Sequence, residues 1–236
     1  MSNMKEYRYH AKAVAAFGGI ERPVVREIPP QAASSLAEGK PGYFSARERA
    51  YRLEEILSFQ AAYTQVAGNE GPEGVFNTLA TATVEKLNVL DMITADVVTA
   101  RLTGEYHAED YDYFKGPWVT PLGSSFVNLR IAGKPFEPKL PPGFIFNLRS
   151  LATYHGYRKR RIEAKGEPAV SCLDSGVLRI PGFGTVILAR LEVAAHPDPE
   201  TQTRLHKLTM IALELGSPVA GRASIGEVET DGGGWP

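Results

Sequence analysis

Apolar and polar residues alternate with a period of two along most of this chain. In the first such segment Tyr7, Tyr9, Ala11, Ala13 and Ala15 fall on one side. The longest is residues 77–106, "NTLATATVEKLNVLDMITADVVTARLTGEY", where small and β-branched residues occupy both faces of two runs. Because this period is typical of half-buried strands and β-branching favours the pleated backbone, the pattern predicts a β-sheet protein whose sheets approach closely.

Further strands are predicted in the second half of the chain. "SSFVNLRIAG" turns through "AGKP" into "FEPKL", and "GVLRIPGFGTVILARLEVAAH" contains the turn sequence "PGFG" between two β runs. "LHKLTMIALEL" and "GRASIGEVE" continue the pattern. Turn residues between alternating runs indicate antiparallel connections.

Three segments interrupt this pattern. Residues 23–44 concentrate Pro, Gly and Ser and are predicted to be an irregular excursion. Residues 45–70 begin like a helix, with Ser45 as a candidate N-cap, but their second half alternates, and we predict a strand over 53–66. Residues 146–162 have the spacing of an amphipathic helix.

The predicted fold is therefore mainly β: an antiparallel β-sandwich, or a partly closed barrel, with one helical insertion at about 146–162. We expect a single domain over residues 1–236 with a flexible tail at 229–236. The chain length of 236 residues lies within the range of large all-β domains.

Asp96 stands in the most apolar part of the long run. Simple alternation places it on the same face as Val98, Ala100 and Leu102. We interpret it as a structural carboxylate that accepts backbone N–H bonds or lies near a basic residue, rather than as a catalytic acid.

Composition narrows the range of partners. The formal net charge is −1, from 26 basic and 27 acidic side chains, so no overall field attracts nucleic acid or anionic lipid. No apolar run is long enough for a membrane helix, and nucleic acid is not an expected partner. The single cysteine, Cys172, excludes an intramolecular disulfide and is interpreted as an inert thiol.

The first candidate for a ligand site is a pocket lined by aromatic residues. Such a pocket would combine an apolar lining with hydrogen-bonding groups, as ligand sites do. Its predicted lining residues are Tyr106, His107, Tyr113, Trp118 and His155. A second candidate is a patch for an anionic partner at Arg158, Lys159, Arg160 and Arg161, although a solvated helix end also explains these residues. No catalytic residue, metal site or cofactor is predicted, because none of the common catalytic or metal-binding motifs is present.

The order of motifs resembles the choice-of-anchor P family of bacterial proteins. The resemblance rests on "ITAD", "LGSSFVNLRIAGKPFE", "GVLRIPGFGTVILARLEV" and "GRASIGEVE", within residues 75–228. It implies a β-rich, surface-attached protein of undefined activity, and supplies no catalytic residues. The sequence departs from the family because it has no clear N-terminal signal and no anchor in its tail. Two locations are therefore left open: the resemblance implies an extracytoplasmic protein, whereas the lack of a clear signal favours a cytoplasmic one.

These observations favour a non-enzymatic structural or surface-assembly protein that self-associates into a homo-oligomer through strand edges, since unpaired ladder groups can template another strand. The alternative is a small-ligand-binding protein or an unusual enzyme that uses the aromatic pocket. Convergence of the aromatic residues on a concave site would favour the alternative.

Overall fold

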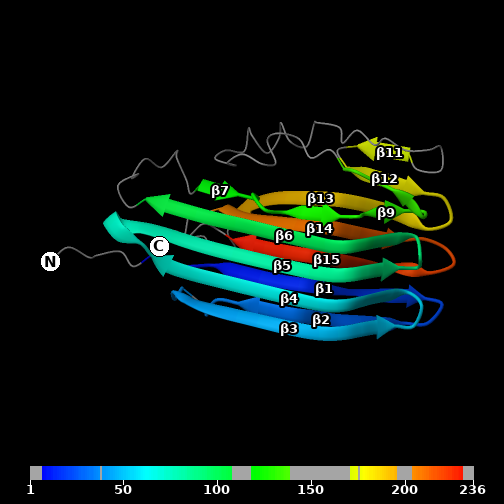
Figure 1. Cartoon of the computed structure of the whole chain (residues 1–236), viewed down its shortest axis with the longest axis horizontal. Helices are drawn as coiled ribbons and strands as arrows, with labels where there is room; N and C mark the ends of the chain where they lie inside the picture. The colour runs from blue at the N-terminus through cyan, green and yellow to red at the C-terminus, as the bar shows by residue number, and fades with distance from the viewer. Residues whose placement is uncertain are drawn as a thin grey trace.

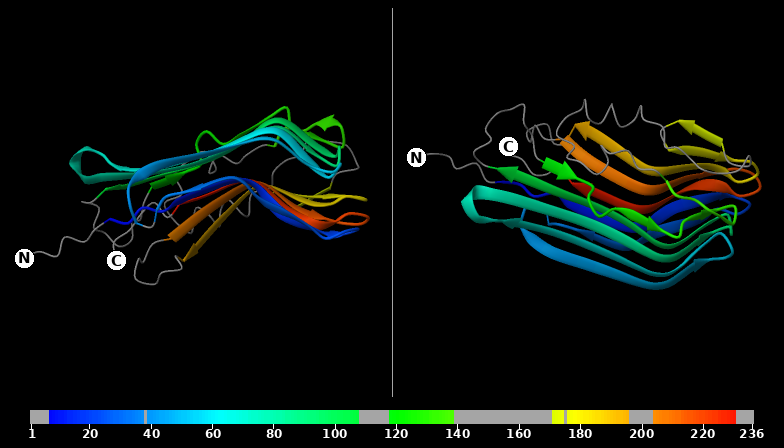
Figure 2. Two further views of the ribbon diagram at one scale, coloured as in Figure 1. Left: turned by 90° about the horizontal axis from the view of Figure 1, so that it is seen from below. Right: turned by 45° about the horizontal axis from the view of Figure 1, so that its top comes forward.

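Two antiparallel sheets stacked face to face make up the molecule, as Figures 1 and 2 show. The computed structural model describes residues 7–37, 39–107, 118–138, 171–174, 176–195 and 204–230. The strands of these residues form two separate sheets with one hydrophobic core between them. The predicted β-sandwich is confirmed.

The front sheet in Figure 1 has eight strands in the order β10-β9-β6-β5-β4-β3, with β7 and β8 also paired to β6. Its strands are β3 (Gly42–Leu53), β4 (Leu57–Glu70), β5 (Val75–Val89), β6 (Ile93–His107), β7 (Trp118–Thr120), β8 (Ser125–Val127), β9 (Arg130–Ile131) and β10 (Lys134–Pro135). A short 3-10 turn, η1 (Pro72–Gly74), joins β4 to β5.

The back sheet has seven strands in the order β11-β12-β13-β14-β15-β1-β2. They are β11 (Ser171–Asp174), β12 (Val177–Ile180), β13 (Gly184–Ala195), β14 (Arg204–Leu215), β15 (Ala220–Thr230), β1 (Ala11–Arg22) and β2 (Arg26–Ser35). The first and last strands of the chain therefore lie side by side within this sheet, as Figure 1 also shows.

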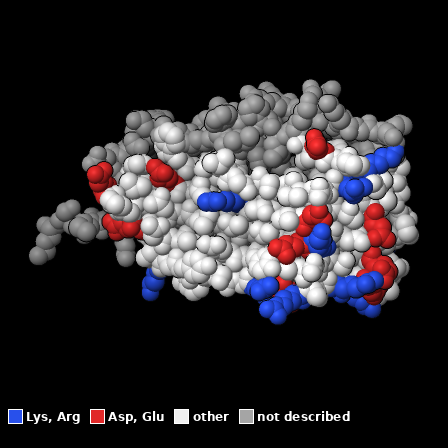
Figure 3. All heavy atoms as spheres, in the orientation of Figure 1, with Lys and Arg blue, Asp and Glu red and all other residues white. Residues whose placement is uncertain are grey.

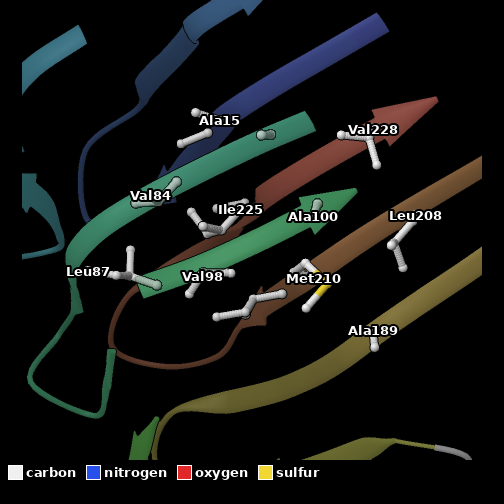
Figure 4. Close-up of a cluster of buried hydrophobic side chains, with 14 of the residues drawn as sticks. Ala15, Val84, Leu87, Val98, Ala100, Ala189, Leu208, Met210, Ile225 and Val228 are labelled. Atoms are coloured by element: carbon white, nitrogen blue, oxygen red, sulfur yellow. The ribbon is translucent and has the colours of Figure 1, made fainter. Parts of the chain in front are cut away.

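Small residues let the two sheets approach closely. Figure 4 shows Ala100 of β6 near Met210 of β14, among the buried aliphatic side chains of both sheets. A Cβ atom added to Gly226 would lie 3.6 Å from the Cβ of Ala100 and 3.4 Å from that of Met210. Nearby, the Thr78 and Thr230 hydroxyls form a buried hydrogen bond of 2.9 Å between the sheets. The Ala/Thr-rich strands thus pack closely, as the sequence predicts.

Both sheets bend partway along their strands (Figure 2). A row of left-handed residues crosses each sheet on alternate strands: Ala50, Lys86 and Asn128 in front, with φ of 50°, 53° and 50°, and Ala32, Gly226 and Ala189 behind, with φ of 45°, 63° and 51°. The pairing register is the same on either side of Lys86, with Glu85 opposite Val97 and Leu87 opposite Ala95. At Lys86 the bend of the front sheet therefore arises from backbone conformation and inserts no residue, unlike a β-bulge.

This bend changes which side chains of β6 face outward. Asp96 and Val97 are both partly exposed, whereas Ala95 and Val98 are buried, so the alternation shifts by one residue at this point. The prediction that Asp96 shares a face with Val98, Ala100 and Leu102 is wrong, because simple alternation ignores the bend. The expectation that Asp96 lies near a basic residue is met by Lys86, whose Nζ donates a hydrogen bond of 2.7 Å to Asp96 Oδ1.

Two further segments differ from the sequence prediction. Residues 23–44, expected to be irregular, contain β2 and the start of β3. Pro29 and Pro30 are compatible with β2 because it is an edge strand, where a missing N–H costs no ladder bond. The strand expected over 53–66 is present as β4, Leu57–Glu70, which begins and ends four residues later than predicted. β3 occupies the start of the segment, where the residue types also favour a helix.

The remaining fold predictions concern the chain ends and the insertion. The helix expected at 146–162 lies outside the described residues. Of the predicted tail, Glu229 and Thr230 belong to β15, and residues 231–236 lie outside the described residues.

Candidate functional site

An open depression of about 420 Å³ lies on the outer face of the front sheet. Figure 3 shows this face: charged groups gather toward the right-hand end, acidic groups also lie toward the left-hand end, and the area over β4 and β5 between them is largely uncharged. The depression is lined by Ala67, Asn69, Asn77, Thr78, Leu79, Arg101, Thr103, Gly104, Glu105, Trp118 and Thr120.

A row of polar groups and one indole forms one side of the depression. Asn69 pairs with Asn77, Asn77 with Glu105, and Glu105 with Trp118, so four neighbouring strands contribute one residue each. With strands about 4.8 Å apart, this row spans about 14 Å. It provides two amides, a carboxylate and an indole that is 40% exposed.

The next row forms the floor. Ala67 pairs with Leu79, Leu79 with Thr103, and Thr103 with Thr120. These small and apolar side chains point to the same face as the polar row, because strand residues two apart share a face. The floor can therefore contact the body of a ligand while the polar row binds its hydrogen-bonding groups.

Arg101 closes the other side of the depression, and its backbone is held by the turn after β7. The Arg101 N–H donates to Ser124 Oγ at 2.9 Å, and the Ser124 hydroxyl donates to the Arg101 carbonyl at 3.0 Å. Gly123 has φ of +95°, and a Cβ added there would be 3.1 Å from Arg101 Cδ. The turn thus packs against the aliphatic part of Arg101 because this position has no side chain.

Glu105 is paired at the polar row. A ring nitrogen of His107, Nε2, lies 2.5 Å from Glu105 Oε1, and both side chains are partly exposed. The carboxylate of Glu105 is therefore balanced by His107 whenever the imidazole is protonated.

The structure brings only part of the predicted aromatic pocket together. Trp118 lines the depression, and His107 contacts it through Glu105. Tyr106 takes part instead in an aromatic cluster with Tyr7 and Phe76, whose rings stack 4.1 Å apart. Tyr113, His155 and the basic patch at 158–161 lie outside the described residues.

Sequence reasoning missed Asn69, Asn77, Arg101 and Glu105. A signal for Arg101 existed, because alternation from Thr99 to Thr103 places this arginine among outward-facing threonines. No signal in the sequence alone identifies Asn69 and Asn77 as neighbours, because their pairing depends on the register of β4 and β5.

A second charged group on the same face, Asp96, has hydrogen-bonding partners on neighbouring strands. Asp96 accepts hydrogen bonds from Asn128 and Lys86 at the bend. These bonds, together with the positive charges of Lys86 and Arg130, hold the pKa of Asp96 below its ordinary value. Asp96 is thus an ionised group whose partners are supplied by neighbouring strands.

The outer face of the back sheet also carries paired charges. His10 Nε2 lies 2.7 Å from Glu229 Oε1, and Lys207 Nζ lies 3.1 Å from Glu227 Oε1. Burial raises the pKa of Glu229, but the hydrogen bond from His10 and nearby positive charges outweigh it and leave the pKa lowered.

Among the described residues, no group of three or more His, Cys, Asp or Glu side chains is placed to hold a metal ion. Likewise, none of the helices within the described ranges is long and apolar enough to cross a membrane.

Residues 7–159 match the family described as Domain of unknown function (DUF8256), and the chain belongs to this family. The matched range contains all eight strands of the front sheet and the depression, but only β1 and β2 of the back sheet. No curated protein and no solved structure matches the chain.

Proposed function

We propose that this protein is a non-enzymatic binding domain whose depression holds a small, hydroxyl-rich ring compound such as a sugar. The observation that carries this proposal is the 40% exposed indole of Trp118 at the end of the polar row, beside a floor of small side chains and one leucine. An exposed indole offers a flat apolar surface to a ring, and the neighbouring amides both donate and accept hydrogen bonds.

The neutral groups favour a sugar over a nucleic acid. Among the residues that line the depression, Arg101 is the one cation, whereas a phosphate backbone requires a track of basic residues. Amides and threonine hydroxyls match the mixed donors and acceptors of sugar hydroxyls.

A test compares Trp118→Ala with Leu122→Ala in a screen of short oligosaccharides by saturation-transfer NMR and calorimetry. Leu122 is a matched control, because it is 59% exposed on the adjoining turn and does not line the depression. We expect Trp118→Ala to weaken binding roughly fivefold, since aromatic contacts are worth about 1 kcal/mol. Equal binding by wild type and Trp118→Ala, or no sugar bound by wild type, would contradict the proposal.

A second candidate function is self-assembly through the β3 edge, which the resemblance to surface-attached choice-of-anchor P proteins also supports. β3 is a 12-residue strand paired to β4 at the edge of the front sheet, and Tyr43 and Phe44 are 62% and 46% exposed. Such an edge can accept a strand from a second copy, whereas the prolines of β2 protect the edge of the back sheet.

Light scattering over a concentration series tests the assembly candidate. If β3 mediates assembly, the wild-type mass rises with concentration and Phe44→Lys reduces that rise. A wild-type protein that stays monomeric at every concentration would exclude it.

A further inference from the structure

The depression contains a positive charge that has no counter-charge in the described chain. No ion pair of the Arg101 guanidinium occurs among the described residues. Glu105, the carboxylate in the lining, contacts His107 and makes no ion pair with Arg101. A ligand that brings a negative charge to Arg101 would therefore find a cation without a competing partner.

Arg101 is also positioned before any ligand arrives. Two hydrogen bonds to Ser124 fix its backbone, and Gly123 packs the turn against its stem. Because the stem beside the Gly123 turn has less freedom left to lose, Arg101 binds an anion more favourably than a fully mobile arginine would. The planar guanidinium also matches the two oxygens of a carboxylate.

We propose that the ligand of this depression is an acidic sugar, with its ring on Trp118 and its carboxylate on Arg101. This inference rests on the proposed sugar-binding function and specifies its substrate class. Arg101 and the Glu105–Trp118 row are four residues apart along β6, about 13 Å, a span suited to a short acidic oligosaccharide. A single guanidinium matches the single charge of a carboxylate, whereas a phosphate monoester would retain unmatched charge.

The test uses digalacturonate and its methyl ester as probes, titrated by calorimetry at low salt into the full chain. The two probes differ in charge and share their ring hydroxyls. We expect wild type to bind the acid roughly tenfold more tightly than the ester, with the difference shrinking as salt is added.

Two variants locate the effect. Arg101→Gln is expected to bind the acid and the ester equally, while its affinity for the ester stays that of wild type. Arg49→Gln, which removes an exposed cation on β3 outside the depression, is expected to keep the full preference.

The outcomes separate the two proposals. Equal binding of acid and ester by wild type, with Trp118 still required, would overturn the acidic-sugar inference and leave the sugar-binding function intact. Tighter binding of a sulfated disaccharide than of digalacturonate would also overturn the carboxylate assignment. A preference for the acid that survives in Arg101→Gln would overturn the role of Arg101. Failure of every sugar to bind would overturn both proposals.

Discussion

Two charged residues of β6, Asp96 and Arg101, lie on the same outer face of one sheet and have opposite surroundings. Asp96 stands at the bend, where Lys86 and Asn128 from neighbouring strands donate hydrogen bonds to its carboxylate. Arg101 stands beside the depression, and no ion pair occupies its guanidinium in the part of the chain that the structure describes. The charge at the bend therefore serves the structure, whereas the charge in the depression is the one that we propose a ligand meets.

The largest expected effect comes from disturbing the bend in the back sheet. Gly226→Val places a β-branched side chain at φ of +63°, against Met210 and Ala100. We expect the free energy of unfolding to fall by about 3 kcal/mol, from backbone strain and overpacking together. Urea denaturation measures this loss.

The matched control for this variant is Ser224→Val on the outer face of the same strand. It should change stability by less than about 1 kcal/mol, because β-branched residues suit an outward strand position. A similar loss from both variants would show that the left-handed conformation of Gly226 is not what matters.

A smaller, pH-dependent effect is expected at Asp96. Its pKa is lower in the folded protein than in the unfolded chain, so its ionised form stabilises the fold above the unfolded pKa. This stability is lost as the pH falls through the lower, folded value. Asp96→Asn should therefore reduce the urea midpoint at pH 7, by less than Gly226→Val.

The difference between wild type and Asp96→Asn should narrow as the pH falls below about 4, where Asp96 of the unfolded chain takes up its proton, and be smallest below the lower pKa of the folded protein. A series of urea titrations from pH 7 down to pH 2 checks this. A difference that does not change with pH would mean that the charge of Asp96 has no part in stabilising the bend.

The smallest expected effect is a gain in stability at the edge of the front sheet. Ala50 is exposed on β3 with φ of 50°, a conformation that glycine adopts without steric cost. Ala50→Gly should raise the free energy of unfolding by about 0.5 kcal/mol, after the extra entropy of the unfolded chain is subtracted. Thermal and urea denaturation together resolve a change of this size.

Ala46→Gly in the same strand is the control, and we expect it to change the free energy of unfolding in the opposite direction. Ala46 has no left-handed backbone to relieve, so we expect a loss of about 0.5–1 kcal/mol. If both glycine variants are destabilising, the bend imposes no strain on Ala50.

The period of two identified most of the strands and one face of β1. Tyr7, Tyr9, Ala11, Ala13 and Ala15, which alternation places on one side, are all buried. Alternation did not predict β2, where two prolines interrupt the strand. β2 contains two prolines that only an edge strand tolerates, and position within a sheet is not visible in local sequence.

Asp96 shows a second limit of local reasoning. Its face is decided by a row of left-handed residues on alternate strands, and four of the six are alanine or lysine rather than glycine or asparagine. Because these residue types rarely adopt positive φ, nothing in the sequence indicates the bend.

The site could be predicted only in part. Trp118, which lines the depression, was identified because an aromatic cluster stands out in one stretch of sequence, and His107 of the same stretch contacts the lining residue Glu105. Asn69, Asn77 and Arg101 were missed because strands distant in sequence bring them to one face. Tyr106 was grouped with Trp118 by proximity along the chain, but it lies on the other face of β6 from Glu105.

The pairing of β1 with β15 has a consequence for how the chain acquires its structure during synthesis. Ala11 pairs with Thr230, so a strand made at the beginning receives its neighbour only when the ribosome has nearly reached the end of the sheet. The front-sheet strands from β3 to β6 are joined by short turns and can pair as they emerge, since local contacts form fastest. The β1–β2 hairpin must wait with an open edge, and this interval is when a nascent chain of this kind most needs protection from aggregation.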